Sequence, residues 1–343
     1  MRLFGLTLLG LLMSASASAE ILYRGDFETG NIYDSGSTKV DTFYYAGLGP
    51  NCVNREDNYS AANDNRIITS PVRYGNYANA QTIRYNCDYR PLNEGGLQKP
   101  RQSLKILSKS LSMVEGKEYW LAFSFMLPTS WVSDYSTNRD NLFQLVKEKT
   151  TTAPDARKTG PNIVNIEEYS GNFVMLVDDV IDSNGNASEV EAFKWATTKG
   201  EWQDIIINFK PCRYKASCTG FMKIYVGNSK RRAAGVHMTP VYSRTGPNSK
   251  ADLHTAAINL YKYGWHCQTS YTISGVTYDQ SDYTQCMKNT NSTASTAERT
   301  AYFDEFVIGG ANSSITEVAP YFSGGASSNE PAPPMPPSSI TIN

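Results

Sequence analysis

EYWLAFSFML, residues 118–127, carries the clearest signal for the fold of this chain. Large apolar or aromatic side chains occupy every second position from Tyr119 to Leu127, and mostly smaller or polar ones alternate with them. Because successive side chains of a β-strand point to opposite faces, this period of two predicts a strand with one buried face. Pro128 follows and ends it, since proline cannot donate a hydrogen bond to a neighbouring strand.

Stretches of the same character recur along the chain. We predict strands at residues 101–107, 141–147, 172–177, 202–209, 221–226, 258–266 and 301–308. Turn signals such as SNGN at 183–186 separate them, and no long amphipathic helix is evident. Many short strands in one run predict an all-β fold, namely a β-jelly roll, which is a concanavalin-like sandwich of two antiparallel sheets with long loops. We expect one such domain over residues 20–312.

Both ends of the chain differ from this domain. Residues 1–19 combine Arg2, a short apolar run and an Ala-x-Ala end at Ala19, which is the pattern of a signal peptide cleaved near that residue. We therefore expect a secreted or periplasmic protein. No segment is long and apolar enough to predict a membrane span. Residues 313–343 are rich in Pro, Ser and Gly and are expected to form a flexible tail that builds no core.

Cysteine content and charge narrow the class further. All 6 cysteines follow the signal peptide, and an even number in an exported chain predicts disulfide bonds, with pairing between sequence neighbours favoured and other pairings left open. A zinc site is the competing interpretation, but the chain has no Cys-x-x-Cys pair. The formal net charge of −1 gives no indication of a nucleic-acid partner. We expect a monomer.

A series of motifs, in order along the chain, carries a resemblance to a known family. They are GDFETG (25–30), IITSPV (67–72), RQSL (101–104), WLAFSFMLPTSW (120–131), NLFQ (141–144), GEWQDIIINF (200–209), GFMKIYV (220–226), LYKYGWH (260–266) and YFDEFVIG (302–309). In order and character the set resembles the heparin lyase I-like and glucuronan lyase-like polysaccharide lyases, which share a β-jelly roll. The resemblance covers most of residues 20–312, and it implies that the protein cleaves an anionic polysaccharide by β-elimination.

The chemistry of β-elimination indicates which side chains to seek. The reaction removes the C5 proton of a uronic acid and expels the oxygen at C4. Since that proton is weakly acidic beside a charged carboxylate, the site needs a cation or amide donors on the carboxylate, a base near C5 and an acid near O4. The resemblance implies that Arg101 binds the carboxylate, for which a guanidinium is well shaped. Gln144 is the candidate second donor.

Lys262 and His266 are the candidates for charge and proton transfer. Alternation along residues 258–266 puts both on one face, and Gly264 between them leaves room for a sugar ring. A lysine beside a histidine lowers the imidazole pKa, which favours the neutral base. Four further residues are expected to bind substrate: Lys105, Tyr261, Tyr263 and His254.

Two departures from the family pattern concern this set. The heparin lyase relatives carry Gln-x-His on the strand where this chain has Gln144 and Val146, so that histidine is replaced. On the late strand the relatives have lysine and then tyrosine four residues later, where this chain has Lys262 and His266. The departures bear on the catalytic assignment more than on the fold.

Three acidic residues indicate a metal site away from this chemistry. Asp26, Glu28 and Asp304 lie on the first and last strands, which we expect to be neighbours. Their hard oxygen ligands predict a structural Ca²⁺ site, although no EF-hand spacing is present. The reaction itself is expected to need no cofactor.

Two other classes of function remain open. A non-catalytic, lectin-like carbohydrate-binding jelly roll would bind a polymer without creating unsaturated ends. A hydrolase would need two carboxylates at a suitable separation, but Glu167 and Glu168 are adjacent and so point to opposite faces, and Glu201 has no evident partner. The near-neutral charge favours alginate, glucuronan or a related uronan over heavily sulfated heparin as the substrate.

Overall fold

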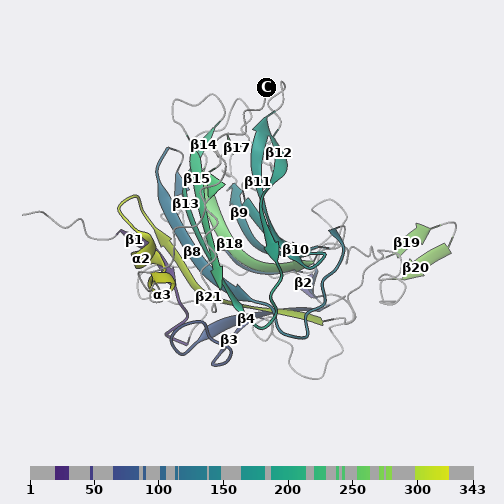
Figure 1. Cartoon of the computed structure of the whole chain (residues 1–343). Helices are drawn as coiled ribbons and strands as arrows, with labels where there is room; N and C mark the ends of the chain where they lie inside the picture. Colours follow the sequence, from purple (N-terminus) through teal and green to yellow (C-terminus); the bar gives the residue numbers. More distant parts are fainter. Residues whose placement is uncertain are drawn as a thin grey trace, which may run out of the picture.

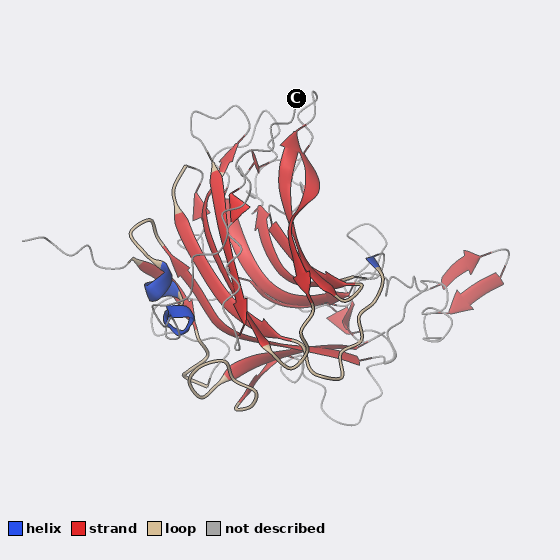
Figure 2. Ribbon diagram, in the orientation of Figure 1, coloured by secondary structure: helices blue, strands red, loops and turns tan. Residues whose placement is uncertain are grey.

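The described part of the chain consists mostly of β-strands (Figures 1 and 2). The computed structural model describes residues 20–30, 47–48, 65–84, 88–89, 101–105, 113–114, 116–136, 139–147, 164–181, 187–213, 220–228, 237–238, 242–243, 253–262, 270–273, 276–279 and 298–323. The expected signal peptide lies outside these residues, and so do the side chains of the cysteines. No helix within these ranges is long and apolar enough to cross a membrane.

The first of two large sheets, sheet A, is antiparallel throughout. Its described strands, in spatial order, are β16 (His237–Met238), β15 (Phe221–Asn228), β13 (Trp202–Lys210), β8 (Tyr119–Met126), β21 (Glu298–Gly309), β4 (Ala78–Arg84) and β3 (Asn65–Ile68), and β1 (Ile21–Gly25) also pairs with β21. The first and last strands of the domain are therefore neighbours, as the sequence predicted.

The second large sheet, sheet B, is also antiparallel. In spatial order it contains β12 (Ala187–Ala196), β11 (Asn172–Ile181), β10 (Val164–Tyr169), β9 (Asp140–Lys147), β18 (Leu253–Lys262) and β6 (Arg101–Lys105), with β7 (Met113–Val114) pairing on β18. Three small pairs join residues elsewhere: β14 (Cys212–Arg213) with β17 (Tyr242–Ser243), β19 (Ser270–Ile273) with β20 (Val276–Asp279), and β2 (Gly47–Leu48) with β5 (Asp88–Tyr89).

The chain passes repeatedly from one large sheet to the other. β8 of sheet A is followed by β9 of sheet B, and β12 of sheet B by β13 of sheet A. Each predicted strand is present with shifted ends, the largest shift being at β18, which begins five residues before the predicted 258 and ends at Lys262. The prediction of an all-β jelly roll with two antiparallel sheets is confirmed.

The hydrophobic core fills the space between sheets A and B. Aromatic side chains join the sheets directly: the ring of Phe123 on β8 stacks on Phe143 of β9 with centroids 4.5 Å apart, and Phe125 meets Phe173 of β11 edge-on at 5.0 Å. Phe123 and Phe125 belong to the large alternating residues of the segment 118–127. The strands of sheet B that contact them also alternate between inward and outward side chains. The residues found in the core therefore show which face of each strand points inward.

Two short helices cover the outer face of sheet A (Figure 1). They are α2 (Ile315–Val318) and α3 (Pro320–Ser323), and Val318 and Phe322 pack on Ala122 and Val307 of sheet A. The expected flexible tail therefore does not begin at residue 313. Apolar residues at the start of the Pro- and Ser-rich region pack on the apolar outer face of sheet A. The average composition of the whole region gives no sign of these residues. Residues 324–343 lie outside the described residues.

Replacing Phe322 with alanine tests this docking. Gly227 of β15 leaves room for the ring, since a Cβ there would lie 2.9 Å from Phe322 Cε2. Phe322→Ala should lower the free energy of unfolding by about 3 kcal/mol, because it empties a buried site between α3 and the outer face of sheet A. Thr316→Ala on the exposed side of α2 should change it by less than about 0.5 kcal/mol. Urea unfolding measures both, and equal effects would contradict the docking.

Candidate active site

The face of sheet B that points away from the core carries a set of amide side chains. Gln144 of β9 stands between Phe143 and Leu145, both of which are core residues. Asn165 of β10 stands between two core residues in the same way, and so does Asn259 of β18. Because neighbours in a strand point to opposite faces, all three amides lie on the outer face. We name this the polar face, and it also includes Asn141, Glu167 and Tyr261.

Hydrogen bonds join the amides of the polar face across three strands. The side-chain oxygen Oδ1 of Asn165 accepts hydrogen bonds from Gln144 Nε2 at 3.4 Å and from Asn141 Nδ2 at 3.2 Å. Asn259 donates its Nδ2 to the side-chain oxygen of Asn141 at 2.6 Å and to the Asn141 backbone oxygen at 3.1 Å. The four amides are at most 4% exposed, so each is held in one orientation by its partners.

A carboxylate and a guanidinium lie at one end of this amide row. Arg139 Nε lies 2.8 Å from Glu167 Oε2, and Asn141 Nδ2 donates to the other Glu167 oxygen at 3.4 Å. The Glu167 side chain is fully buried, whereas the Arg139 side chain is 31% exposed. The charges of Arg139 and Glu167 cancel each other. The pair continues the amide row, because Glu167 of β10 lies directly opposite Asn141 of β9.

Four of the predicted site residues occupy neighbouring register positions of sheet B. Strand register places Arg101 of β6 opposite Tyr261 of β18, and Tyr261 opposite Asn141. In the same way Ala257 has Lys105 on one side and Gln144 on the other. Arg101, Lys105, Gln144 and Tyr261 therefore occupy neighbouring register positions of β6, β18 and β9. The side chains of Arg101 and Lys105 lie outside the described part of the structure.

Lys262 does not belong to this group: contrary to the expectation of one shared site, it lies on the opposite side of sheet B from Gln144 and Tyr261. It follows Tyr261 in β18 and therefore points to the core side, where it is completely buried. Its ammonium lies 3.1 Å from Asp134 Oδ2 and 3.1 Å from Asp140 Oδ2. Alternation correctly put Lys262 on the face of Leu260, but that face is the inside of the sandwich, where two acidic residues from another part of the chain neutralise it.

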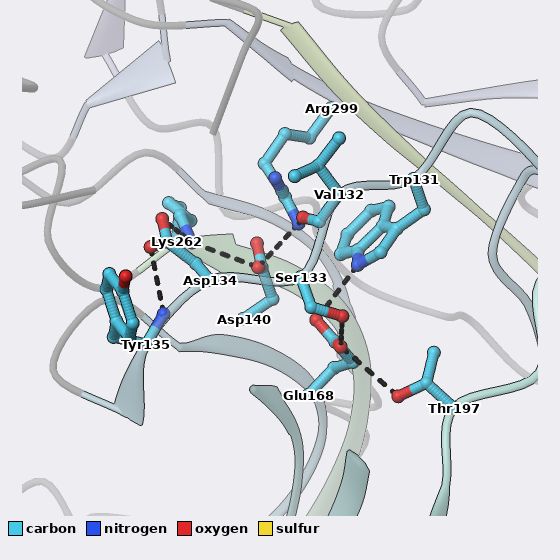
Figure 3. Close-up of polar contacts among 10 residues, drawn as sticks. All are labelled: Trp131, Val132, Ser133, Asp134, Tyr135, Asp140, Glu168, Thr197, Lys262 and Arg299. Carbon is cyan, nitrogen blue, oxygen red and sulfur yellow. Dashed lines mark hydrogen bonds and ion pairs between the residues drawn. The ribbon is translucent and has the colours of Figure 1, made fainter. Parts of the chain in front are cut away.

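The buried lysine is part of a larger cluster of charges between the sheets (Figure 3). Arg299 of β21 lies 2.8 Å from the same Asp140 oxygen, donates to the Val132 backbone oxygen at 2.9 Å, and stacks on the Trp131 ring at 3.8 Å. We name Lys262, Asp134, Asp140 and Arg299 the inner charge cluster. Its two cations and two anions balance, which is the condition for keeping charges in a protein interior.

Glu168 lies beside this cluster on the core side of β10. It accepts hydrogen bonds from Trp131 Nε1 at 2.9 Å, from Thr197 Oγ1 at 3.2 Å and from Ser133 Oγ. Burial raises the pKa of its carboxyl group, and the nearby Asp140 carboxylate raises it further. Glu167 and Glu168 thus face opposite sides of sheet B, as the sequence predicted, and they do not form the carboxylate pair of a hydrolase.

Three predicted site residues cannot be placed on either face. Tyr263 and His266 lie outside the described residues. His254 is within β18, opposite Met113 of β7 and Lys147 of β9, but its side chain is not described. Their proposed roles remain predictions.

The three residues predicted to hold calcium lie close to one another and bind backbone amides. Asp304 Oδ2 accepts from Arg73 N at 2.8 Å, Glu28 accepts from Asn76 N at 2.9 Å, and Asp26 accepts from Glu28 N at 3.3 Å. In the described ranges, no three His, Cys, Asp or Glu side chains are arranged to hold a metal ion. The Ca²⁺ site remains a prediction.

Asp304 and its neighbour Glu305 make the stability of the fold depend on pH. Burial raises the pKa of Asp304 to about 7 and that of Glu305 to about 8, and Asp304 and Asp26 add to the effect on Glu305. Both groups bind protons more tightly in the folded than in the unfolded chain, so their contribution to stability is present at low pH. It is lost as the pH rises from about 4.5 to about 8.

We expect Glu305→Gln to gain stability relative to the wild-type chain over this pH range. The variant cannot ionise, so its advantage should grow by about 2 kcal/mol or more, since one pKa unit corresponds to about 1.4 kcal/mol. Urea unfolding at acidic and mildly alkaline pH, with a chelator present to remove metal ions, measures the difference. A difference that stays constant with pH would contradict the raised pKa of Glu305.

Some residues of the polar face were not found by sequence reasoning. Asn141, Asn165 and Asn259 were not singled out, and Arg139 lies in a segment with no strand pattern. The signal for two of the asparagines is present in the sequence, because Asn165 and Asn259 each stand between two apolar residues. Its meaning depends on strand order, because only β9, β10 and β18 lying side by side bring the asparagines together.

The family model described as "Polysaccharide lyase" matches residues 27–307. The chain belongs to this polysaccharide lyase family. No curated protein matches the sequence significantly.

Solved structures with a similar fold include lyases and a hydrolase. The endo-β-1,4-glucuronan lyase of the fungus Trichoderma reesei shares 15% identity and a TM-score of 0.48, with 81% of this chain and 97% of that one covered. An alginate lyase of polysaccharide lyase family 7 shares 10% identity and a TM-score of 0.44, covering 79% and 95%. The catalytic domain of a GH131 β-glucanase from Podospora anserina shares 12% identity and a TM-score of 0.45, covering 87% and 99%.

Proposed function

We propose that this protein is a secreted polysaccharide lyase that cleaves a uronic-acid-containing polysaccharide, such as alginate or glucuronan, by β-elimination. The observation that carries the proposal is the amide row of the polar face, next to the register positions of Arg101 and Tyr261. Amide N–H groups and a guanidinium are the donors that bind a uronate carboxylate. Family membership supports the reaction class, and the expected signal peptide supports secretion.

In the proposed mechanism the amide of Gln144 and the guanidinium of Arg101 bind the carboxylate attached to C5. The charge of the guanidinium and the dipole of the amide stabilise the negative charge that builds up on this group as the C5 proton leaves, and the hydrogen bond to Asn165 already orients Gln144 before the reaction begins. A base takes the C5 proton, the C4–O4 bond breaks, and a C4=C5 double bond forms. An acid donates a proton to the departing O4.

The proton transfers are assigned to Tyr261 and His266. Tyr261 has a phenol group on the polar face, directly opposite Asn141, and His266 follows five residues later in the chain. Lys262 takes no direct part, because both of its neighbouring carboxylates hold it inside the sandwich. This assignment replaces the sequence-based pair of Lys262 and His266.

A hydrolase is less consistent with the same residues. It needs one carboxylic acid and one carboxylate across the scissile bond. Glu167 is paired with Arg139, and Glu168 accepts three hydrogen bonds on the core side. A lectin-like protein is the second candidate, since a row of buried amides can bind sugar without reacting with it and Val146 replaces the histidine of the heparin lyase relatives.

The test is a panel of uronans with and without enzyme, followed by the ultraviolet absorbance of the unsaturated product. Purified protein should raise the absorbance with at least one uronan, and Arg101→Ala, Tyr261→Phe and His266→Ala should each reduce the rate. Polymer binding without new unsaturated ends would favour the lectin. Release of saturated reducing ends would favour a hydrolase.

A further inference from the structure

The inner charge cluster and the polar face use adjacent residues of the same two strands. Asp140 of β9 and Lys262 of β18 are a directly opposed pair, and the next pair along the ladder is Asn141 with Tyr261. Since successive residues point to opposite faces, the first pair lies inside the sandwich and the second on the polar face. A change in the inner pair therefore shifts the outer pair through a single peptide unit in each strand.

The inner pair is tied to two other segments. The Lys262 ammonium bridges Asp140 of β9 and Asp134 of the connection between β8 and β9, at 3.1 Å to each (Figure 3). Arg299 links Asp140 to sheet A at 2.8 Å. All four side chains are at most 5% exposed. Charges buried to this degree have a narrow range of acceptable positions, because any separation leaves a charge without its counter-ion.

On the other face, Asn141 is the centre of the amide row. It accepts from Asn259 and donates toward both Asn165 and Glu167. Asn165 in turn orients Gln144, the proposed carboxylate donor. The position of Asn141 along β9 thus determines how Gln144 is oriented, and the position of β9 relative to β18 at this point depends on the pair formed by Asp140 and Lys262.

We propose that Lys262 is a positioning residue: its ammonium, bridging Asp134 and Asp140, sets the register and spacing of Asn141 and Tyr261 on the opposite face. The inference rests on the proposed function, because it assigns the polar face to substrate. Lys262 contributes no proton and touches no substrate. Its effect on the reaction comes from holding the reacting groups in place, and a displacement of about 1 Å is enough to lower a rate by about a hundredfold.

The experiment compares three variants. Lys262→Met removes the ammonium and keeps most of the side-chain volume. The double variant Lys262→Met with Asp134→Asn removes one cation and one anion, so the remaining charges of Asp140 and Arg299 still balance. Arg73→Met is the control, since it breaks a partly buried ion pair, 2.8 Å from Asp204, on the outer face of sheet A.

Activity and stability separate positioning from a purely structural role. We expect kcat on the responsive uronan to fall by about 10-fold to 100-fold in Lys262→Met and to stay low in the double variant, with KM within about threefold of wild type. The double variant should recover much of the melting temperature that Lys262→Met loses. Arg73→Met should lose melting temperature and keep its kcat. A double variant that recovers both melting temperature and kcat would overturn the inference.

Amide hydrogen exchange gives a readout that does not need a substrate. Lys262→Met and the double variant should exchange faster than wild type in peptides covering residues 140–147 and 253–262, and Arg73→Met should not. If the wild-type protein cleaves no uronan, the proposed function fails, but this comparison still decides the positioning role. Unchanged exchange in both strands would overturn it.

Discussion

Gln144→Ala is expected to lower kcat for uronan cleavage by about 10²-fold to 10³-fold, which is the cost of removing one donor from a group that stabilises developing negative charge. The negative charge on the uronate carboxylate grows only as the C5 proton leaves. The interaction with Gln144 is therefore strongest in the transition state, so the loss should appear in kcat more than in KM. Initial rates from the absorbance of the unsaturated product measure both constants.

The matched control for this prediction is Gln203→Ala. Gln203 is also a buried glutamine of a central strand, but it lies in sheet A and bonds Trp195 and Thr198. Its loss should lower stability and leave kcat within about threefold of the wild-type value. If Gln144→Ala keeps the wild-type kcat while the protein cleaves a uronan, the carboxylate does not bind at the amide row, and the proposed mechanism is wrong.

The fold class was predictable because eight of its strands, although not β3, β4, β10 or β12, were recognised from their own local signals. In residues 118–127 the inward residues are large and apolar, and Phe123 and Phe125 are indeed the rings that join the two sheets. The jelly-roll order needed the additional information in the motifs, since alternation alone specifies strands but not their neighbours. The helices α2 and α3 were missed because each is only 4 residues long, too short for a helical period.

The candidate site was only partly predictable. The alternation of side chains along β18 correctly separated Tyr261 from Leu260 and Lys262. It could not show which of the two faces of the strand points to the core. A charged lysine normally indicates the solvent side. Here Asp134 and Asp140, more than a hundred residues earlier in the chain, provide the counter-charges that make its burial tolerable. Such compensation between distant residues has no local sequence signature.

Asp140→Asn should produce the largest loss of stability of any substitution considered for this protein, about 3–5 kcal/mol. Asp140 is the anion shared by both cations of the inner charge cluster, with Lys262 at 3.1 Å and Arg299 at 2.8 Å. An asparagine there leaves two buried cations with Asp134 as the remaining carboxylate of the cluster. Glu298→Gln, an exposed carboxylate beside Arg299 in β21, is the control and should cost less than about 0.5 kcal/mol.

A double-mutant cycle with Lys262→Met shows whether this loss comes from uncompensated charge. The double variant Asp140→Asn with Lys262→Met has one cation and one anion left in the cluster, so its loss should be smaller than the sum of the two single losses by about 2 kcal/mol. Urea unfolding of the four proteins gives the coupling energy, provided that the free energy of unfolding falls with urea concentration at the same slope in all of them. Additive losses would mean that Asp140 stabilises the fold through its packing and backbone environment, and that Lys262 is neutralised by Asp134 alone.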